Sequence, residues 1–216
     1  MAEQMQHKIK QMLRGIDRYN PNNLGHLETY VLRQSLDNYY DLEANLAVLK
    51  LYQFNPKETK KETVIAILLK ALTALPNTDF VLCKCLIDST LLEDETIALI
   101  TSLHNLLETC RFQHFWGELS AKPDLIRGIN GFENSIRKFI CHVIQITYQT
   151  IEKSTLRLLL GGLADNQLNQ WMTQSGWKDI ENGFVFIANQ EENIKTKNIT
   201  EKIDLENVAQ VIAAYR

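Results

Sequence analysis

The sequence lacks both a long apolar run and an excess of positive charge. Its longest apolar stretches, 64–69 and 158–164, fall short of the roughly 20 residues of a membrane-spanning helix. Residues 1–10 are polar, so we expect no secretory signal. The net charge is −3, and Lys and Arg do not outnumber Asp and Glu in either half of the chain. We therefore expect no membrane association and a protein of the cytoplasm, with the nucleus as an additional compartment.

Sequence motifs of enzymes are also missing. The chain contains no phosphate-binding loop, no dinucleotide-binding glycine pattern, no His-Glu-x-x-His helix and no Gly-x-Ser-x-Gly turn. Scattered Ser, His and Asp residues do not define a triad without geometry. We therefore predict a protein without enzymatic activity and without a cofactor.

The four cysteines, Cys83, Cys85, Cys110 and Cys141, lie in apolar, helix-like stretches. In a reducing compartment we expect them to be buried free thiols. A metal site is the alternative, because Cys110 and His114 are four residues apart and would share a helical face. Cys83 and Cys85 would point apart on a helix, so packing is the better account and no metal is predicted. His142, in another apolar stretch, is likewise expected in the core.

The first part of the chain predicts a stack of helices. All four prolines lie before residue 124 and separate segments with helical spacing of apolar residues. Leu24, Leu27, Val31 and Leu32 share one face, and Asp41 is placed to cap the next helix. Expected helical segments follow at 41–53, 62–75, 79–88, 95–108 and 111–119, the second of them apolar almost all round. Short connections between them predict antiparallel pairs of the HEAT or tetratricopeptide kind, although no strict repeat is present.

The second part predicts a winged helix. Glycines cluster near residues 128–131, so the expected domains are a helical-repeat domain, 1–130, and a winged-helix domain, 131–216. A long helix over 132–148 precedes a short extended piece, a helix capped by Ser154 and a helix capped by Asp165. Asn182-Gly183 lies between two β-rich runs, 177–180 and 184–187, which is a strong signal for a small β-hairpin. A polar loop over 189–198 and a last helix from Asp204 follow. The fold class is thus mostly α with a small β-hairpin.

The helix predicted over 165–175 would be the recognition helix of a DNA-binding winged helix, yet it contains no Lys or Arg. Helices that enter a DNA groove meet phosphates and base edges and carry positive charge for that purpose. We therefore expect no direct binding of duplex DNA and a module that contacts protein.

The hairpin and the last helix are the predicted contact regions. An outer hairpin strand offers unpaired backbone groups, and an apolar helix stripe can join a partner's helices. The candidate protein-binding residues are Phe184, Phe186, Val208, Val211 and Ile212. The alternative is that these side chains close the core of their own domain.

Several sequence blocks carry a family resemblance. Gly15-Ile-Asp-Arg-Tyr-Asn-Pro21 and the long block from Tyr40 to Pro56 are the most specific. Further matching blocks lie at 78–85, 106–110, 137–143, 146–149, 197–199 and 201–204. Over nearly its whole length the sequence resembles the K-subunit family of eukaryotic translation initiation factor 3. The architecture, a PCI domain, is similar to that of scaffold subunits of the proteasome lid and the signalosome.

The resemblance implies a non-enzymatic scaffold subunit within the initiation factor. Such a complex binds the small (40S) ribosomal subunit and promotes assembly of the pre-initiation complex. The implied direct partner is the L subunit of the same factor. The alternative function is that of a winged-helix regulator that binds nucleic acid, and the uncharged recognition helix argues against it.

Overall fold

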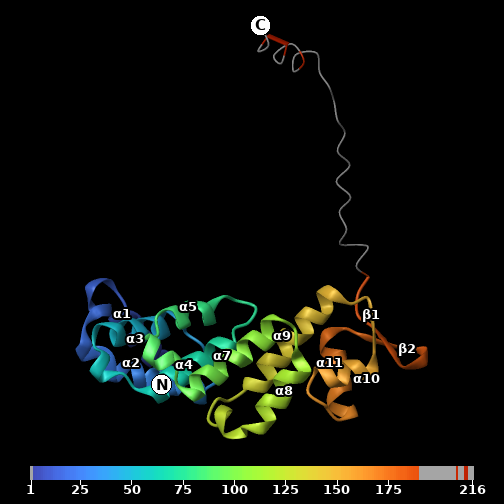
Figure 1. Ribbon diagram of the computed structural model, residues 1–216, viewed down its shortest axis with the longest axis horizontal. Coiled ribbons are helices and arrows are strands. Elements are labelled where there is room, and N and C mark those ends of the chain that lie inside the picture. Colours follow the sequence, from blue (N-terminus) through green and yellow to red (C-terminus); the bar gives the residue numbers. More distant parts are fainter. Residues whose placement is uncertain (1, 190–207, 209–211, 214–216) are drawn as a thin grey trace.

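The protein is elongated, with helical layers at one end and a small sheet at the other (Figure 1). The computed structural model describes residues 2–189, 208, 212 and 213. Eleven α-helices and one three-stranded sheet lie within this part of the chain. None of the helices described there has the length and apolar character needed to cross a membrane.

Eight helices form the array that begins at the N-terminus. They are α1 (Ala2–Met12), α2 (Leu24–Leu36), α3 (Leu42–Phe54), α4 (Lys61–Leu72), α5 (Asp79–Cys85), α6 (Ser89–Leu92), α7 (Glu95–Glu108) and α8 (Phe112–Ala121). Short 3-10 helices connect them: η1 (Gly15–Tyr19), η2 (Pro21–Asn23), η3 (Pro56–Glu58) and η4 (Pro123–Ile126). Pro21, Pro56 and Pro123 each start one of the connectors, where a missing N–H costs no hydrogen bond. The predicted role of proline in separating the helices is confirmed at these positions.

The core of the array surrounds α4. Its side chains are buried on nearly every face, including Val64, Ile67 and Leu68, which confirms the expected central helix. Lys70, predicted to interrupt the apolar surface, is itself only 2% exposed. The ends of α2 and α3 are joined by a buried polar network, in which the Gln34 side-chain amide donates to Asn45 Oδ1 at 2.9 Å.

Asp41 fixes the start of α3. Its carboxylate accepts the backbone N–H of Ala44 at 3.2 Å, which confirms the predicted cap. Its own N–H donates to Gln34 Oε1 at 2.8 Å. The cap of one helix is therefore tied to a buried side chain of the preceding helix, which sets the geometry of the turn between them.

The remaining elements form a winged helix. They are α9 (Phe132–Thr147), β1 (Thr150–Glu152), α10 (Lys153–Leu159), α11 (Asp165–Ser175), β2 (Lys178–Ile180) and β3 (Phe184–Phe186). The predicted class, mostly α with a small hairpin, is confirmed. The extended piece before α10 adds a third strand, since β1 pairs antiparallel with β3 and the sheet order is β1-β3-β2. Ile151 and Val185 point inward at the same register and are buried, which explains the pairing.

Several local predictions are wrong. Ser154 lies one residue inside α10, where its hydroxyl donates to Glu152 Oε1 at 2.6 Å instead of capping the helix. Asp165 is the first residue of α11, and Ala164 occupies the cap position. Leu32 and His142 are exposed, because the buried stripes of their helices are narrower than expected. In α9 the inward positions are those of Phe132, Ile136, Phe139, Ile140 and Ile144.

His104 gives the fold a predicted pH dependence. Its ring is buried and stacks on Phe80 with centroids 4.0 Å apart, and burial lowers the pKa of His104 below its usual value, with a smaller opposing effect of Glu108. The unfolded chain then binds more protons than the folded chain below the ordinary His pKa of 6.5. We expect the free energy of unfolding to fall as the pH drops from about 7.5 to about 5.

The measurement is urea unfolding of the wild type and His104→Phe at both pH values. The variant keeps a ring against Phe80 but cannot be protonated, so its stability should fall less between the two pH values than that of the wild type. Equal losses for the two proteins would contradict the assignment to His104.

Candidate protein-binding surfaces of the winged helix

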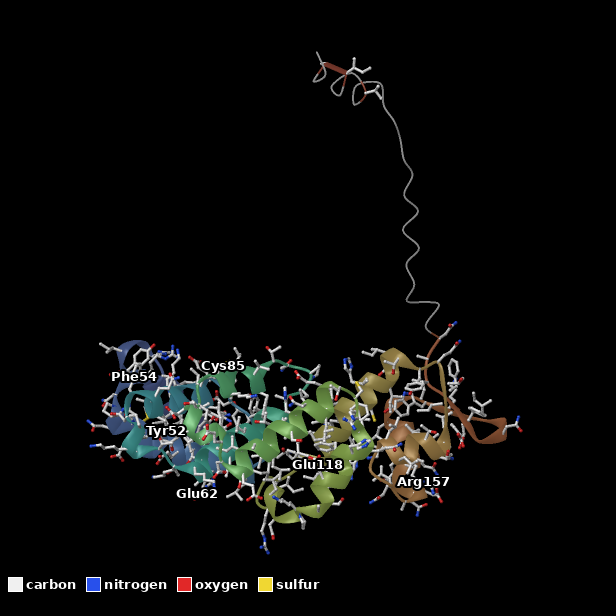
Figure 2. The ribbon with its side chains drawn as sticks, viewed as in Figure 1. Tyr52, Phe54, Glu62, Cys85, Glu118 and Arg157 are labelled. Carbon is white, nitrogen blue, oxygen red and sulfur yellow. The ribbon has the colours of Figure 1, made fainter. Side chains whose placement is uncertain are left out.

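The outer face of α11 is polar and uncharged. Its exposed side chains are amides and one hydroxyl, and they line a shallow open hollow: Asn166, Asn169, Gln170, Thr173 and Gln174. Asp165, the charged residue of this helix, forms an ion pair with Arg157 of α10. Figure 2 labels Arg157 on the winged helix. This ion pair neutralises Arg157, and the side chains that line the hollow carry no positive charge for phosphates.

The inner face of α11 holds the helix against the domain. Leu168 and Met172 are buried and Trp171 is partly buried, as predicted. Gly176 ends the helix with φ +72°, and its N–H bonds to the carbonyl oxygens of Met172 and Thr173. This left-handed residue turns the chain sharply into β2, so the predicted C-terminal role of Gly176 is confirmed.

The outer sheet face presents apolar side chains to solvent. In the sheet register Glu152, Phe184 and Ile180 lie side by side, as do Thr150, Phe186 and Lys178. Phe184 is 45% exposed and Ile180 43% exposed, and Phe186 is partly buried. The opposite face closes the core through Trp177, Val185 and Ile187. Phe184 thus does not fill the core of its own domain, which was the alternative role for it.

The free edges of the sheet are those of β1 and β2. β3, which carries both phenylalanines, is hydrogen-bonded on both sides, and the N–H of Ile187 extends the pairing to Gln149 at 2.9 Å. An additional strand from another protein would therefore have to pair with β1 or β2. Phe184 and Phe186 are available through their side chains alone. Sequence reasoning missed Ile180, although its place opposite Phe184 follows once the hairpin register is known.

The predicted contact residues near the C-terminus are only partly described. Val208 is 39% exposed and Ile212 is 63% exposed. Val211 and most of the helix expected from Asp204 lie outside the described residues, as does most of the polar loop over 189–198. Of the predicted contact residues, those that the described part of the chain brings together are Phe184 and Phe186, on β3.

Trp116 of α8 joins the winged helix to the helical array. Its indole N–H donates to the carbonyl oxygen of Leu159 at 2.9 Å. The Arg137 guanidinium of α9 lies 4.9 Å from the centre of the Trp116 ring and donates to the Leu160 carbonyl at 3.1 Å. Gly161 lies directly against the ring: a Cβ at this glycine would be 2.9 Å from a ring carbon. Three helices, α8, α9 and α10, therefore meet at one aromatic side chain.

A second contact fixes the start of α9. Asn130 donates through its backbone N–H to the carbonyl oxygen of Ser35 at 2.9 Å and through its side chain to that of Leu36 at 2.6 Å. Gly131, with φ +75°, packs so closely on Asn38 that a Cβ would collide with its side chain. With Trp116, these contacts hold the winged helix at a defined angle to the array.

The candidate metal site is not formed. Cys110 lies between α7 and α8 with φ +56°, so a helix break separates it from His114 and the four-residue spacing has no geometric meaning. Cys85 and Cys110 are exposed, contrary to the expected burial, whereas Cys83 and Cys141 are buried. Burial raises the pKa of Cys83 to about 12, which keeps its thiol protonated. Among the described residues no group of three or more His, Cys, Asp or Glu side chains could hold a metal ion.

Comparison with known proteins agrees with this architecture. A family model described as the CSN8/PSMD8/EIF3K family matches residues 58–198. A Xenopus laevis protein named eukaryotic translation initiation factor 3 subunit K is 56% identical over 212 residues, which cover 98% of this chain and 97% of that protein. The Homo sapiens protein of the same name is 55% identical over 214 residues, covering 99% and 98%. The Nematostella vectensis protein of that name is 49% identical over 216 residues and both full lengths.

Proposed function

Since the chain belongs to the CSN8/PSMD8/EIF3K family, we propose that it is a non-enzymatic scaffold subunit of eukaryotic translation initiation factor 3. In this role it acts in the cytoplasm, and additionally in the nucleus, through protein–protein contacts. It reaches the small (40S) ribosomal subunit through the complex, whose function is to promote assembly of the pre-initiation complex. The observation that carries the proposal is an exposed apolar sheet face beside an uncharged recognition helix.

We assign different roles to the two domains, a helical-repeat domain over 1–130 and a winged helix over 131–216. The array provides a long rigid body, and the winged helix ends in the outer sheet face. We assign the direct contact with the L subunit to Phe184, Phe186 and Ile180 of this face, together with Val208, Val211 and Ile212 near the C-terminus. A few well-packed side chains near the centre of a contact area supply most of the binding free energy in protein complexes.

The alternative function, nucleic-acid binding through the winged helix, lacks a supporting charge distribution. Arg157 is paired with Asp165 and Lys153 is paired with Asp179 at 2.5 Å. The exposed Lys178 of β2 is one cation close to the end of α11 and does not provide the track of positive charge that phosphate contacts need. Tight duplex binding with a steep salt dependence would revive this alternative.

A substitution on the outer sheet face tests the proposed function. Phe184→Asp places a charge at an exposed position, so the fold should be kept while an apolar contact is lost. We expect recovery of the L subunit in affinity purification after mild lysis and nuclease treatment to fall by about tenfold or more. Circular dichroism should show unchanged helical content.

The control is Leu82→Asp, which changes an exposed apolar side chain of α5 in the helical array. This variant should recover the L subunit as the wild type does. Wild-type recovery by Phe184→Asp would contradict the assignment of this face. Purification of the wild-type chain without other subunits of the factor would contradict the proposed function itself.

A further inference from the structure

The N-terminal end of the array carries a second apolar surface, distant from the winged helix. Ile16 is 85% exposed and Phe54 is 65% exposed, and Tyr19 is also exposed. Figure 2 shows Phe54 at this end of the molecule, where α1, α2 and α3 are also found in Figure 1. We refer to Ile16, Tyr19 and Phe54 as the end patch. Neither the core nor the contacts proposed above account for the exposure of these three side chains.

The end patch is built from two elements held in a fixed arrangement. The Tyr19 ring of η1 meets the Phe54 ring at the end of α3 edge to face, with centroids 6.1 Å apart. Arg18 forms an ion pair with Glu43 of α3 at 2.8 Å, and the Asn23 side chain donates to the Asp17 carbonyl at 3.1 Å. A surface that is already ordered loses little conformational entropy when a partner binds.

Positive charge predominates in the segments that carry the end patch, in a chain whose net charge is negative. The part of the chain that leads into it carries Lys8, Lys10, Arg14 and Arg18 against one acidic residue, Asp17, over residues 7–19. Lys50 lies one helical turn before Phe54 and therefore on the same face of α3. Lys57 follows in η3, next to Glu58. Lys8, Lys10, Arg14, Lys50 and Lys57 are all exposed and have no ion pair among those of the described residues.

We propose that the end patch binds a short acidic segment of a partner protein that presents apolar side chains on one helical face. The apolar side chains of that segment pack on Ile16 and Phe54, and its carboxylates meet Lys50, Lys57 and Arg14. Charge complementarity of this kind speeds association and selects the partner. Single-stranded RNA fits less well, because the most exposed side chain, Ile16, is aliphatic and cannot stack on a base.

Fluorescence anisotropy with the full-length chain tests the proposal. The probe is a labelled 16-residue peptide with Leu at helical i, i+3, i+4 spacing and Glu or Asp at the other positions. A peptide with Lys in place of every acidic residue and a labelled U-rich RNA of 20 nucleotides are the comparison probes. We expect the acidic peptide to bind at least about tenfold more tightly than either of them, and its affinity to fall with added salt.

Variants locate the binding. Ile16→Asp and Phe54→Asp, each at an exposed position, should weaken binding of the acidic peptide about tenfold or more, and Lys50→Glu should weaken it several-fold. Phe184→Asp, at the other end of the molecule, should bind the acidic peptide as the wild type does. Loss of peptide binding and loss of the proposed L-subunit contact can therefore be told apart. Equal binding of the acidic and basic peptides, or unchanged binding by Ile16→Asp and Phe54→Asp, would overturn the proposal. Preferential binding of the RNA, lost in Phe54→Asp, would replace it with an RNA surface.

Discussion

Gly161→Ala is expected to destabilise the protein by about 2–5 kcal/mol, far more than the same change at the next residue. Both glycines have positive φ, +88° at Gly161 and +70° at Gly162, and an alanine in this region costs about 1–2 kcal/mol. Only at Gly161 would the new methyl group also collide with the Trp116 ring, 2.9 Å away. Overpacking against a rigid ring adds about 1–3 kcal/mol. Chemical denaturation followed by circular dichroism measures both variants.

Gly162→Ala is the matched control, since nothing lies within 4 Å of its Cβ position. It shares the backbone strain and lacks the collision, so the difference between the two variants isolates the packing of Trp116 on α10. A second readout follows from the same contact: displacement of the ring breaks its hydrogen bond to Leu159. Limited proteolysis should then cut between the array and the winged helix faster in Gly161→Ala. Equal free energies of unfolding of the two variants would show that the Trp116 ring moves aside without a loss of stability.

Lys70→Met is expected to stabilise the protein by about 1–3 kcal/mol. Lys70 is 2% exposed in the last turn of the core helix α4, and no carboxylate of the described residues forms an ion pair with its ammonium group. Burial therefore lowers the pKa of Lys70, which means that the fold disfavours its charged form. Methionine has a similar length and flexibility and carries no charge.

The pH dependence of this gain follows from the sign of the pKa shift. The unfolded chain keeps a proton on Lys70 up to its ordinary pKa of 10.5, whereas the folded chain releases it at lower pH. The wild type therefore becomes more stable as the pH rises through this window, and the advantage of Lys70→Met shrinks. Urea unfolding at neutral and at alkaline pH measures the difference. Lys138→Met, at an exposed position of α9, should change stability by less than about 0.5 kcal/mol, and a destabilised Lys70→Met would contradict the interpretation.

Features set by neighbouring residues could be predicted from the sequence. The Asp41 cap, the apolar helix around Val64–Leu72 and the hairpin at Asn182-Gly183 each depend on residues within a few positions of one another. Asn182 adopts φ +68° and Gly183 φ +78°, which these two residue types tolerate better than others. The absence of positive charge in α11 could also be read directly, because composition does not depend on packing.

Features set by residues far apart in the chain could not be predicted in this way. The pairing of β1 with β3 joins Thr150 to Phe186, and only this register shows that Ile180 shares the outer sheet face with Phe184. The predicted helices over 95–108 and 111–119 already left Cys110 in the connection between them, but they did not predict its left-handed backbone, φ +56°. The end patch was missed for a similar reason: Phe54 fits the helical pattern of α3, and only the solved packing shows that its ring meets Tyr19 instead of the core.

The contact of Asn130 with the end of α2 can form only late in the synthesis of the chain. Ser35 and Leu36 leave the ribosome early, but the residue that bonds to the carbonyl of Leu36 lies 94 positions later. At a translation rate of about 5–20 residues per second, this delay is about 5–20 s. During that time the carbonyl oxygens of Ser35 and Leu36 lack the hydrogen bonds that Asn130 donates to them in the folded protein. The contact that ties the start of α9 to the end of α2 can thus form only after residue 130 has left the ribosome, when the helices from α1 to α8 have already been synthesised.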